Sequence, residues 1–194
     1  MPNFSKPIIF CDWYGVLSFS HLFEGVDNKT QIEDELFRDS KKLLRAACVD
    51  LSDVDLCTII AERLQLNPQE LRTQYLESWQ KVTWNQEYLD FLQQFRSDYT
   101  LILITDNLES FGTIVAPKIS AYFHEIHCSF EVGTLKSNPD NQFFHNTAKK
   151  LNSDLSQAIL IDDTKINRDI FSQFGHKTFV DIVDFQSVNS SDAN

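Results

Sequence analysis

Three short apolar runs, each followed at once by polar residues, constrain the fold of this chain more than any other feature of its sequence. The runs and the polar residues behind them are 8–11 with Asp12, 101–104 with Thr105, and 158–161 with Asp162 and Asp163. An unbroken apolar run, rather than an alternating one, is typical of a strand that is covered on both faces. Parallel sheets between layers of helices contain such strands, so the pattern predicts an α/β protein.

A long helical segment separates the first two runs. Apolar spacing predicts helices at 31–49, 54–66 and 69–82, and the last of these begins with an N-cap residue and a proline at its first position, Asn67 and Pro68. This connection is longer than a simple crossover between parallel strands requires. We therefore predict a small all-helical cap domain at residues 18–83, beside a Rossmann-like three-layer core with a mostly parallel sheet.

The predicted core comprises residues 1–17 and 84–185. Within it we expect helices at 86–96, 108–116 and 140–151, which alternate with short strands at 125–130 and 177–180. Residues 186–194 are polar and predict a flexible tail.

Charge and cysteine usage limit the classes of partner. The formal net charge is -11, so the field around the protein repels polyanions and nucleic acid is not an expected partner. The basic cluster Lys41, Lys42 and Arg45 is interpreted as a solvated helix face. The four cysteines show no paired spacing, and no apolar run is long enough for a signal peptide or a membrane span. These features predict a cytoplasmic protein without a membrane partner, and they leave its oligomeric state open.

The ends of the predicted strands carry the candidate site. In open parallel sheets the loops at the carboxyl ends of the strands gather at one edge, where ligands bind. Asp12, Thr105 and the pair Asp162 and Asp163 all follow strands, and Lys136 lies just before a predicted helix. A single carboxylate at a strand end is often only a helix cap. Several polar groups brought to one edge in this order instead indicate a binding site.

This set of residues suits a phosphoryl group. Asp12 can attack phosphorus to give an aspartyl-phosphate, which divides one difficult substitution into two easier ones. Mg²⁺ prefers carboxylate oxygens and would be held by Asp12 with Asp162 or Asp163. Lys136 and the hydroxyl of Thr105 would bind the phosphoryl oxygens. The expected ligand is therefore a small phosphorylated molecule.

Four segments of the chain resemble, in order, the sequence motifs of the haloacid dehalogenase-like (HAD-like) hydrolase superfamily. They are IIFCDWYGVL, LILITDN, LKSNPD and ILIDDTKINRD. The resemblance implies the Rossmann-like core and a helical cap inserted after the first motif. It implies the following roles: Asp12 as the nucleophile; Thr105, Asp106, Asn107 and Lys136 on the phosphate side; and Asp12, the backbone carbonyl of Tyr14, Asp162 and Asp163 as metal ligands. Asn167 resembles a polar residue that follows the last motif.

The chain departs from this pattern at Tyr14. Most phosphatases of the superfamily have an aspartate there, two residues after the nucleophile, which acts as general acid and base. Such help is typically worth about 10² to 10⁴ in rate. A phenol, with an ordinary pKa of about 10, replaces it poorly at neutral pH. Tyr14 is therefore a candidate catalytic residue, and we expect weak activity.

Three functions remain open from the sequence. The first is a Mg²⁺-dependent phosphohydrolase of a small metabolite. The second is a catalytically impaired HAD-like protein that binds or regulates a partner. The third is a metal-free 2-haloacid dehalogenase, because D-x-Y-G-x-L resembles the first motif of those enzymes. The adjacent acids Asp162 and Asp163 argue against this third function, because they repel each other unless a cation lies between them. Candidates for substrate contact in the cap are Phe19, His21, Phe23 and residues 79–84.

Overall fold

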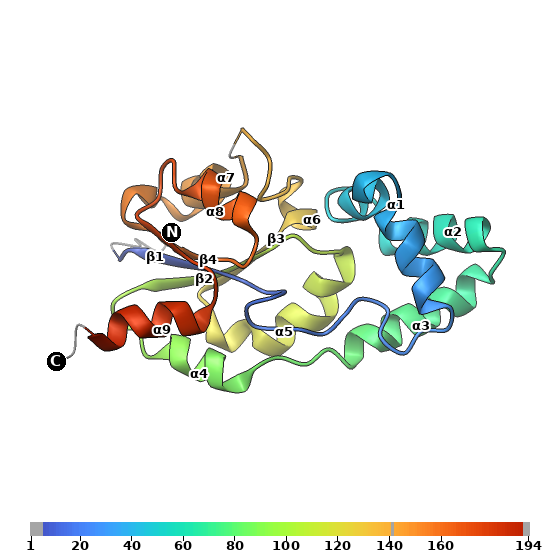
Figure 1. The fold of residues 1–194 in the computed structure, drawn as a ribbon, viewed down its shortest axis with the longest axis horizontal. Helices are drawn as coiled ribbons and strands as arrows, with labels where there is room; N and C mark the ends of the chain where they lie inside the picture. The colour runs from blue at the N-terminus through green and yellow to red at the C-terminus, as the bar shows by residue number, and fades with distance from the viewer. Residues whose placement is uncertain (1–5, 141, 192–194) are drawn as a thin grey trace.

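A five-stranded parallel sheet forms the centre of the molecule (Figure 1). The computed structural model describes residues 6–140 and 142–191 of the 194-residue chain. The strands are β1 (Ile8–Asp12), β2 (Thr100–Thr105), β3 (Glu125–Cys128), β4 (Ile159–Ile161) and β5 (Lys177–Phe179). Their order is β3-β2-β1-β4-β5, so the chain reverses its winding direction at β1. In open α/β sheets such a switch point is where ligands bind.

Helices cover both faces of the sheet, which gives the predicted three-layer architecture. The helical elements are α1 (Lys29–Ala47), α2 (Asp53–Leu64), α3 (Pro68–Gln80), α4 (Gln86–Gln93), α5 (Ala116–Ile119), α6 (Ser129–Val132), α7 (Gln142–Leu151), α8 (Lys165–Phe171) and α9 (Ile182–Ser191). Helices α7 and α8 lie on one side of the sheet, while α4, α5 and α9 lie on the other (Figure 1). The sequence-based fold class is confirmed.

Alternation along β1 divides the core between the two faces. Ile8 and Phe10 belong to a buried cluster with residues of α7 and α8, whereas Ile9 and Cys11 belong to the cluster on the opposite face. Successive side chains of a strand point to opposite faces, so a strand that is buried on both sides must be apolar throughout. All five residues of β1 are buried, Asp12 included. The apolar run therefore delivers a carboxylate to the edge of the sheet.

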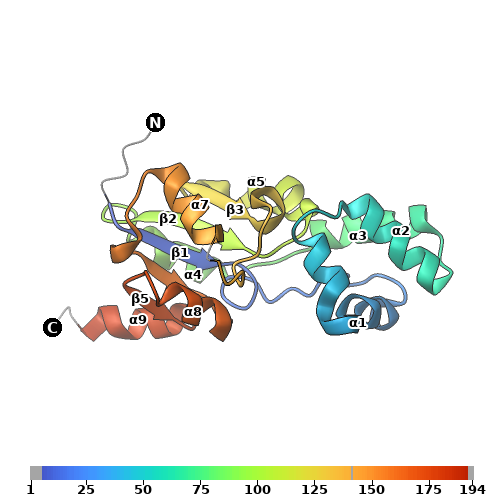
Figure 2. The same cartoon turned by 90° about the horizontal axis from the view of Figure 1, so that it is seen from above.

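The helices α1, α2 and α3 lie together beyond the carboxyl ends of the strands (Figures 1 and 2). They fall within the segment predicted as the cap, residues 18–83. A buried carboxylate joins this group to the core: Asp53 accepts hydrogen bonds from the hydroxyl of Tyr75 in α3 and from that of Ser110 in the core. The backbone N–H of Asp53 in turn donates to Glu109 at 3.1 Å.

Helix α1 is broken, although the sequence predicted one continuous helix at 31–49. The backbone is extended at Arg38 and left-handed at Asp39, Ser40 and Lys41, with φ of 50°, 58° and 64°. Left-handed backbone costs a non-glycine residue roughly 1 to 2 kcal/mol, which apolar spacing does not reveal. The result is a sharp turn between two helical pieces.

Other boundaries also differ from the sequence-based ones. The predicted helix at 108–116 contains a π-helical turn at Phe111–Val115 before α5 begins. The predicted strand at 125–130 ends at Cys128, and α6 follows directly. Residues 186–191, which were predicted to belong to a flexible tail, instead continue α9. Phe185 of this helix is buried among aromatic rings. Residues 192–194 lie outside the described part of the chain. None of the helices in the described residues is both long enough and apolar enough to span a membrane.

Candidate active site

Three of the predicted residues form a buried charge cluster at the end of β1. The amine of Lys136 lies 2.6 Å from Oδ2 of Asp12 and 2.8 Å from Oδ2 of Asp162. Lys136 is 2% exposed, Asp12 6% and Asp162 0%. Asp12 ends β1, Asp162 directly follows the neighbouring strand β4, and Lys136 comes from the loop before α7. The fold thus brings Asp12 together with two residues that lie more than a hundred positions further along the sequence.

The electrostatics of this cluster depend on a single cation. Burial alone would lower the pKa of the Lys136 amine, but Asp12, Asp162 and Asp106 raise it, and the net shift is upward. The pKa of Asp12 is also raised, first by burial and then by the charge of Asp162, against the lowering effect of Lys136. Lys136 is therefore a fixed positive charge, and Asp12 is a carboxylate that a further cation would stabilise in its charged form.

The acidic residues fit the predicted Mg²⁺ site. Asp12, Asp162 and Asp163 each offer a carboxylate oxygen, and these oxygens lie within 4.8 Å of one another. Oxygen ligands from several carboxylates are the donor set that Mg²⁺ prefers. The backbone makes room for this arrangement: Gly15 has φ of 82°, and a Cβ atom there would clash with the carboxylate of Asp163. The adjacent acids thus converge on Asp12.

Asn167 supports Asp162 and leaves one polar atom unpaired. Its side-chain amide donates to both carboxylate oxygens of Asp162, at 3.2 and 3.1 Å, and the backbone N–H of Thr164 donates to Oδ1 at 2.9 Å. Asn167 is 3% exposed, and its own Oδ1 has no hydrogen-bond partner among the described residues. A buried acceptor without a partner is unfavourable, and a water molecule bound to a metal beside Asp162 would satisfy it.

Hydrogen bonds link the four residues predicted to lie on the phosphate side. Thr105 ends β2 and is 1% exposed; the amide of Asn107 donates to its hydroxyl at 3.4 Å. The side chain of Asp106 accepts the backbone N–H of Lys136 at 2.9 Å and thereby fixes the loop that carries the lysine. Burial raises the pKa of Asp106, while Lys136 lowers it. Asp106 therefore acts on Lys136 through its carboxylate, a role that the sequence did not reveal.

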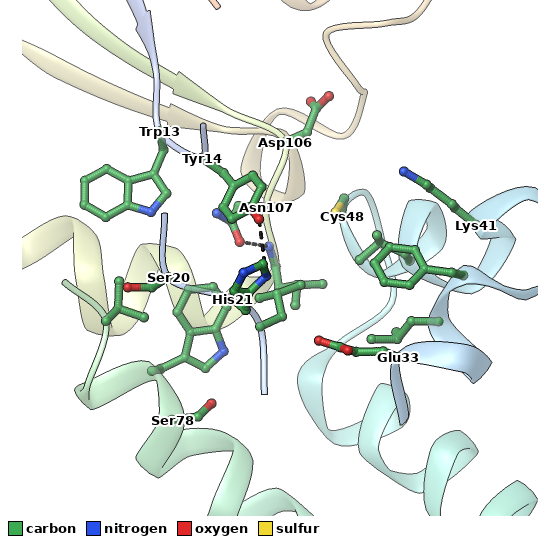
Figure 3. Close-up of a pocket in the computed structure, with 17 residues that line it drawn as sticks. Trp13, Tyr14, Ser20, His21, Glu33, Lys41, Cys48, Ser78, Asp106 and Asn107 are labelled. Carbon is green, nitrogen blue, oxygen red and sulfur yellow. Dashed lines mark hydrogen bonds between the residues drawn. The ribbon is translucent and has the colours of Figure 1, made fainter. Parts of the chain in front are cut away.

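Tyr14 lies near the surface, two residues after Asp12. It is 47% exposed, and its hydroxyl lies 3.4 Å from Nδ1 of His21 (Figure 3). The two rings meet edge to face with centroids 6.2 Å apart. Sequence reasoning named both residues but did not predict their contact, because nothing in the spacing of seven residues specifies how the chain turns between them.

A crevice of about 530 Å³ opens beside the charge cluster, between the core and the cap helices. Trp13, Tyr14, Asp106 and Asn107 line it from the core, and His21 from the segment that leads to α1 (Figure 3). On the cap side, its lining includes Glu33, Phe37 and Lys41 of α1 and Trp79 of α3. His21 and Trp79 were sequence candidates for substrate contact. Phe23 is instead buried in the core of the molecule, and Phe19 lines a neighbouring hollow.

Comparison with known proteins gives no match at the level of sequence: neither a family model nor a curated protein matches the chain. Its structure resembles a HAD-family enzyme from Bacteroides thetaiotaomicron in complex with magnesium, with a TM-score of 0.69 and 16% identity over 90% of this chain and 92% of that one. The same enzyme has also been solved with magnesium and inorganic phosphate.

Two further structures are similar. A predicted HAD-like family hydrolase from Porphyromonas gingivalis has a TM-score of 0.72 and 18% identity, with 90% of each chain covered. A 2-haloacid dehalogenase from Pseudomonas syringae pv. Tomato has a TM-score of 0.67 and 14% identity, with 96% of this chain and 99% of that one covered. The chain therefore has the fold of the HAD-like enzymes, a Rossmann-like parallel sheet with a helical cap.

Proposed function

We propose that this protein is a Mg²⁺-dependent phosphohydrolase that acts on a small phosphorylated metabolite through an aspartyl-phosphate on Asp12. The observation that carries the proposal is the buried arrangement of Asp12, Lys136 and Asp162, with the carboxylate of Asp163 beside it. A nucleophilic carboxylate, a fixed cation and two further acids are what in-line transfer of a phosphoryl group to an aspartate requires.

In the first step, a carboxylate oxygen of Asp12 forms a bond to phosphorus while the bond from phosphorus to the substrate's ester oxygen breaks. Lys136 stabilises the charge on the phosphoryl oxygens, and the hydroxyl of Thr105 donates to them. Mg²⁺ bound by Asp12, Asp162 and Asp163 would reduce the repulsion between the carboxylate and the phosphate. In the second step water attacks phosphorus, releases phosphate and restores the Asp12 carboxylate.

Tyr14 determines which leaving groups suit this chemistry. The departing oxygen must gain a proton when it is strongly basic, and the aspartate that usually supplies it is absent here. A leaving group that is stable as an anion, such as a phenolate, needs no such donor. We therefore expect the protein to hydrolyse aryl phosphates faster than alkyl phosphates.

The test is hydrolysis of an aryl phosphate by the intact protein, first with Mg²⁺ and then with a chelator, compared with Asp12→Asn. We expect turnover that needs the metal and disappears in the variant, while its circular dichroism spectrum and unfolding midpoint show that it still folds. Asp169→Asn, which removes an exposed carboxylate from α8, is the matched control and should retain full activity. Turnover that persists in Asp12→Asn would refute the role of Asp12.

The two alternatives make different predictions in the same assay. The dehalogenase hypothesis is favoured by the fold shared with the Pseudomonas enzyme. A metal-free reaction, however, gives no reason for the carboxylates of Asp162 and Asp163 to lie within 4.8 Å of that of Asp12. It predicts metal-independent release of halide from a 2-haloacid. A non-catalytic binding protein would show no turnover of either compound while still binding Mg²⁺.

A further inference from the structure

The crevice beside the active site carries one lysine at its cap end. Lys41 is the single lysine or arginine among the described residues that line this crevice, and its neighbours Lys42 and Arg45 do not line it. The amine of Lys41 points from the cap toward the core side of the crevice (Figure 3). The sequence had assigned all three cations to a solvated face, and the structure separates Lys41 from the other two.

The position of Lys41 is fixed by unusual backbone. Asp39, Ser40 and Lys41 are all left-handed, and the residues on either side of this turn, Phe37 and Lys41, line the crevice. Non-glycine residues persist in this conformation only where the surrounding structure holds them, and they often occur at ligand-binding sites. The amine of Lys41 also lies 5.3 Å from the centroid of the Phe37 ring, on the other side of the turn.

Hydrogen bonds connect the end of α1 to the phosphate side of the active site. The backbone N–H of Asn107 donates to the hydroxyl of Ser129 at 3.0 Å, and that hydroxyl donates to the carbonyl of Cys48 at 2.6 Å. Cys48 directly follows α1 and is buried. The second piece of α1, which begins after Lys41, is therefore held in a defined position relative to the residues that follow β2.

The charge of Lys41 has no acidic partner. In the part of the chain that the structure describes, no carboxylate forms an ion pair with this amine. Lys136 is already paired with Asp12 and Asp162. Beside four acidic residues of the core, Asp12, Asp106, Asp162 and Asp163, a second anionic group on a substrate would be repelled. On the cap side of the crevice the same group would meet the amine of Lys41, while Glu33, the acidic residue that lines this side, lies 3.9 Å from the amine of Lys29.

The apolar lining indicates what lies between the two charged ends. Trp13, Leu22, Leu36 and Trp79 line the crevice between core and cap. Apolar walls favour an apolar ligand body, and a few placed polar groups fix its orientation. Ser20, His21 and Ser78 also line the crevice, and they are the few polar groups that could orient such a ligand.

We propose that Lys41 selects phosphate monoesters whose alcohol has an apolar body and ends in a carboxylate. This inference rests on the proposed phosphohydrolase function, which it deepens by naming the substrate class. Lys41 is then a specificity-determining residue that contacts the part of the substrate opposite the phosphate.

The test compares aryl phosphates that differ only at the far end of the molecule. Para-carboxyalkylphenyl phosphates with side chains of increasing length are each paired with the corresponding neutral carboxamide. The intact protein should hydrolyse the acid with about fivefold higher kcat/KM at the best length, the upper range for an ion pair with an exposed lysine. Lys41→Met should remove this preference, and Lys42→Met, which changes the adjacent exposed lysine, should retain it.

A binding measurement separates this inference from the proposed chemistry. The corresponding benzylphosphonates, which cannot be hydrolysed, are titrated into the protein with Mg²⁺ by calorimetry. If the protein binds the acid more tightly than the amide, and Lys41→Met removes this difference, the inference is supported. It is supported even if no phosphate ester is hydrolysed, in which case only the phosphohydrolase function fails. Equal binding and equal turnover of acid and amide at every length, or a preference unchanged in Lys41→Met, overturns the inference and leaves the phosphohydrolase function standing.

Discussion

Lys136 lies in the buried cluster at the end of β1, Lys41 lines the crevice from the cap side, and the protein holds them in different ways. Lys136 is 2% exposed and contacts two carboxylates, whereas Lys41 is exposed and pairs with none in the described structure. The position of Lys136 is set by the sheet, because the strands bring its two partners, Asp12 and Asp162, to the same edge. The position of Lys41 depends on a turn in a cap helix, and its charge stays available to a ligand. The proposed reaction chemistry and the proposed substrate selection thus lie in regions with different structural constraints.

The largest expected effect comes from removing the core lysine. Lys136→Met leaves Asp12 and Asp162 buried without their cation, so we expect a loss of about 3 kcal/mol in the free energy of unfolding, measured with urea in the presence of chelator. Turnover should fall by about 10² or more, because the phosphoryl oxygens lose their fixed positive charge.

The corresponding substitution of the cap lysine should have little effect on stability. Lys41→Met alters an exposed side chain without an acidic partner, so the free energy of unfolding should stay within about 0.5 kcal/mol of the parent value. Equal destabilisation by the two substitutions would contradict the difference we draw between the two regions.

A gain of function is expected at Tyr14, which borders both regions. Tyr14→Asp would provide the general acid that the site lacks, so turnover of an alkyl phosphate should rise by about 10² while an aryl phosphate gains less. Tyr14→Phe removes only the hydroxyl that contacts His21 and should change both rates little. Steady-state kinetics with both esters provides the measurement, and a loss of alkyl phosphatase activity in Tyr14→Asp would contradict this explanation.

A smaller effect, on Mg²⁺ affinity, is expected at Gly15, whose backbone lies against the predicted metal ligand Asp163. Gly15→Ala places a Cβ atom against the carboxylate of Asp163, so Mg²⁺ affinity measured by calorimetry should fall about tenfold, the effect typical of moving a ligand's support. Gly133→Ala is the matched control, because Gly133 has a similar φ of 76° but no atom within 4 Å of the added Cβ. Both variants should lose about 1 kcal/mol of stability from left-handed backbone, and only the first should lose metal affinity.

The smallest effect concerns His127, a buried group away from both regions. Its Nε2 lies 2.7 Å from Glu125 and its Nδ1 3.2 Å from the hydroxyl of Thr147, which suits a neutral ring that donates to the acid and accepts from the hydroxyl. Burial lowers the pKa of His127, and the hydrogen bond to Glu125 opposes this shift only in part. The unfolded chain therefore binds the proton more readily, so the stabilisation is present above the ordinary pKa of histidine and is lost as the pH falls below it.

Urea unfolding at about pH 7.5 and about pH 5.5 measures this loss, on either side of the ordinary pKa of histidine. His127→Gln should unfold with less dependence on pH than the parent protein. An unchanged pH dependence would mean that the acid sensitivity arises elsewhere, for instance in the carboxylate cluster.

The sequence predicted the core far better than the cap crevice, for a physical reason. An apolar run that ends in a carboxylate specifies both a buried strand and a group at the edge of the sheet, so Asp12 and Asp162 could be placed before the structure was known. Lys136 followed from its position before a helix. The structure brings these three residues into contact.

The crevice could not be predicted in this way. Lys41 lies in a helical pattern, and no local signal in the sequence indicates the three consecutive left-handed residues found there. The support that Asp106 gives to the backbone of Lys136 was also missed, since it joins two loops that are distant in sequence.

The most direct test of the central claim is a search for the covalent intermediate. The protein with Mg²⁺ is mixed with excess aryl phosphate, quenched in acid within the first turnovers, digested and examined by mass spectrometry. We predict a phosphoryl adduct on the peptide that contains Asp12, removed by hydroxylamine as expected for an acyl phosphate and absent from Asp12→Asn. Steady turnover without an adduct on that peptide, or an adduct that persists in Asp12→Asn, would contradict the assignment of Asp12 as the nucleophile.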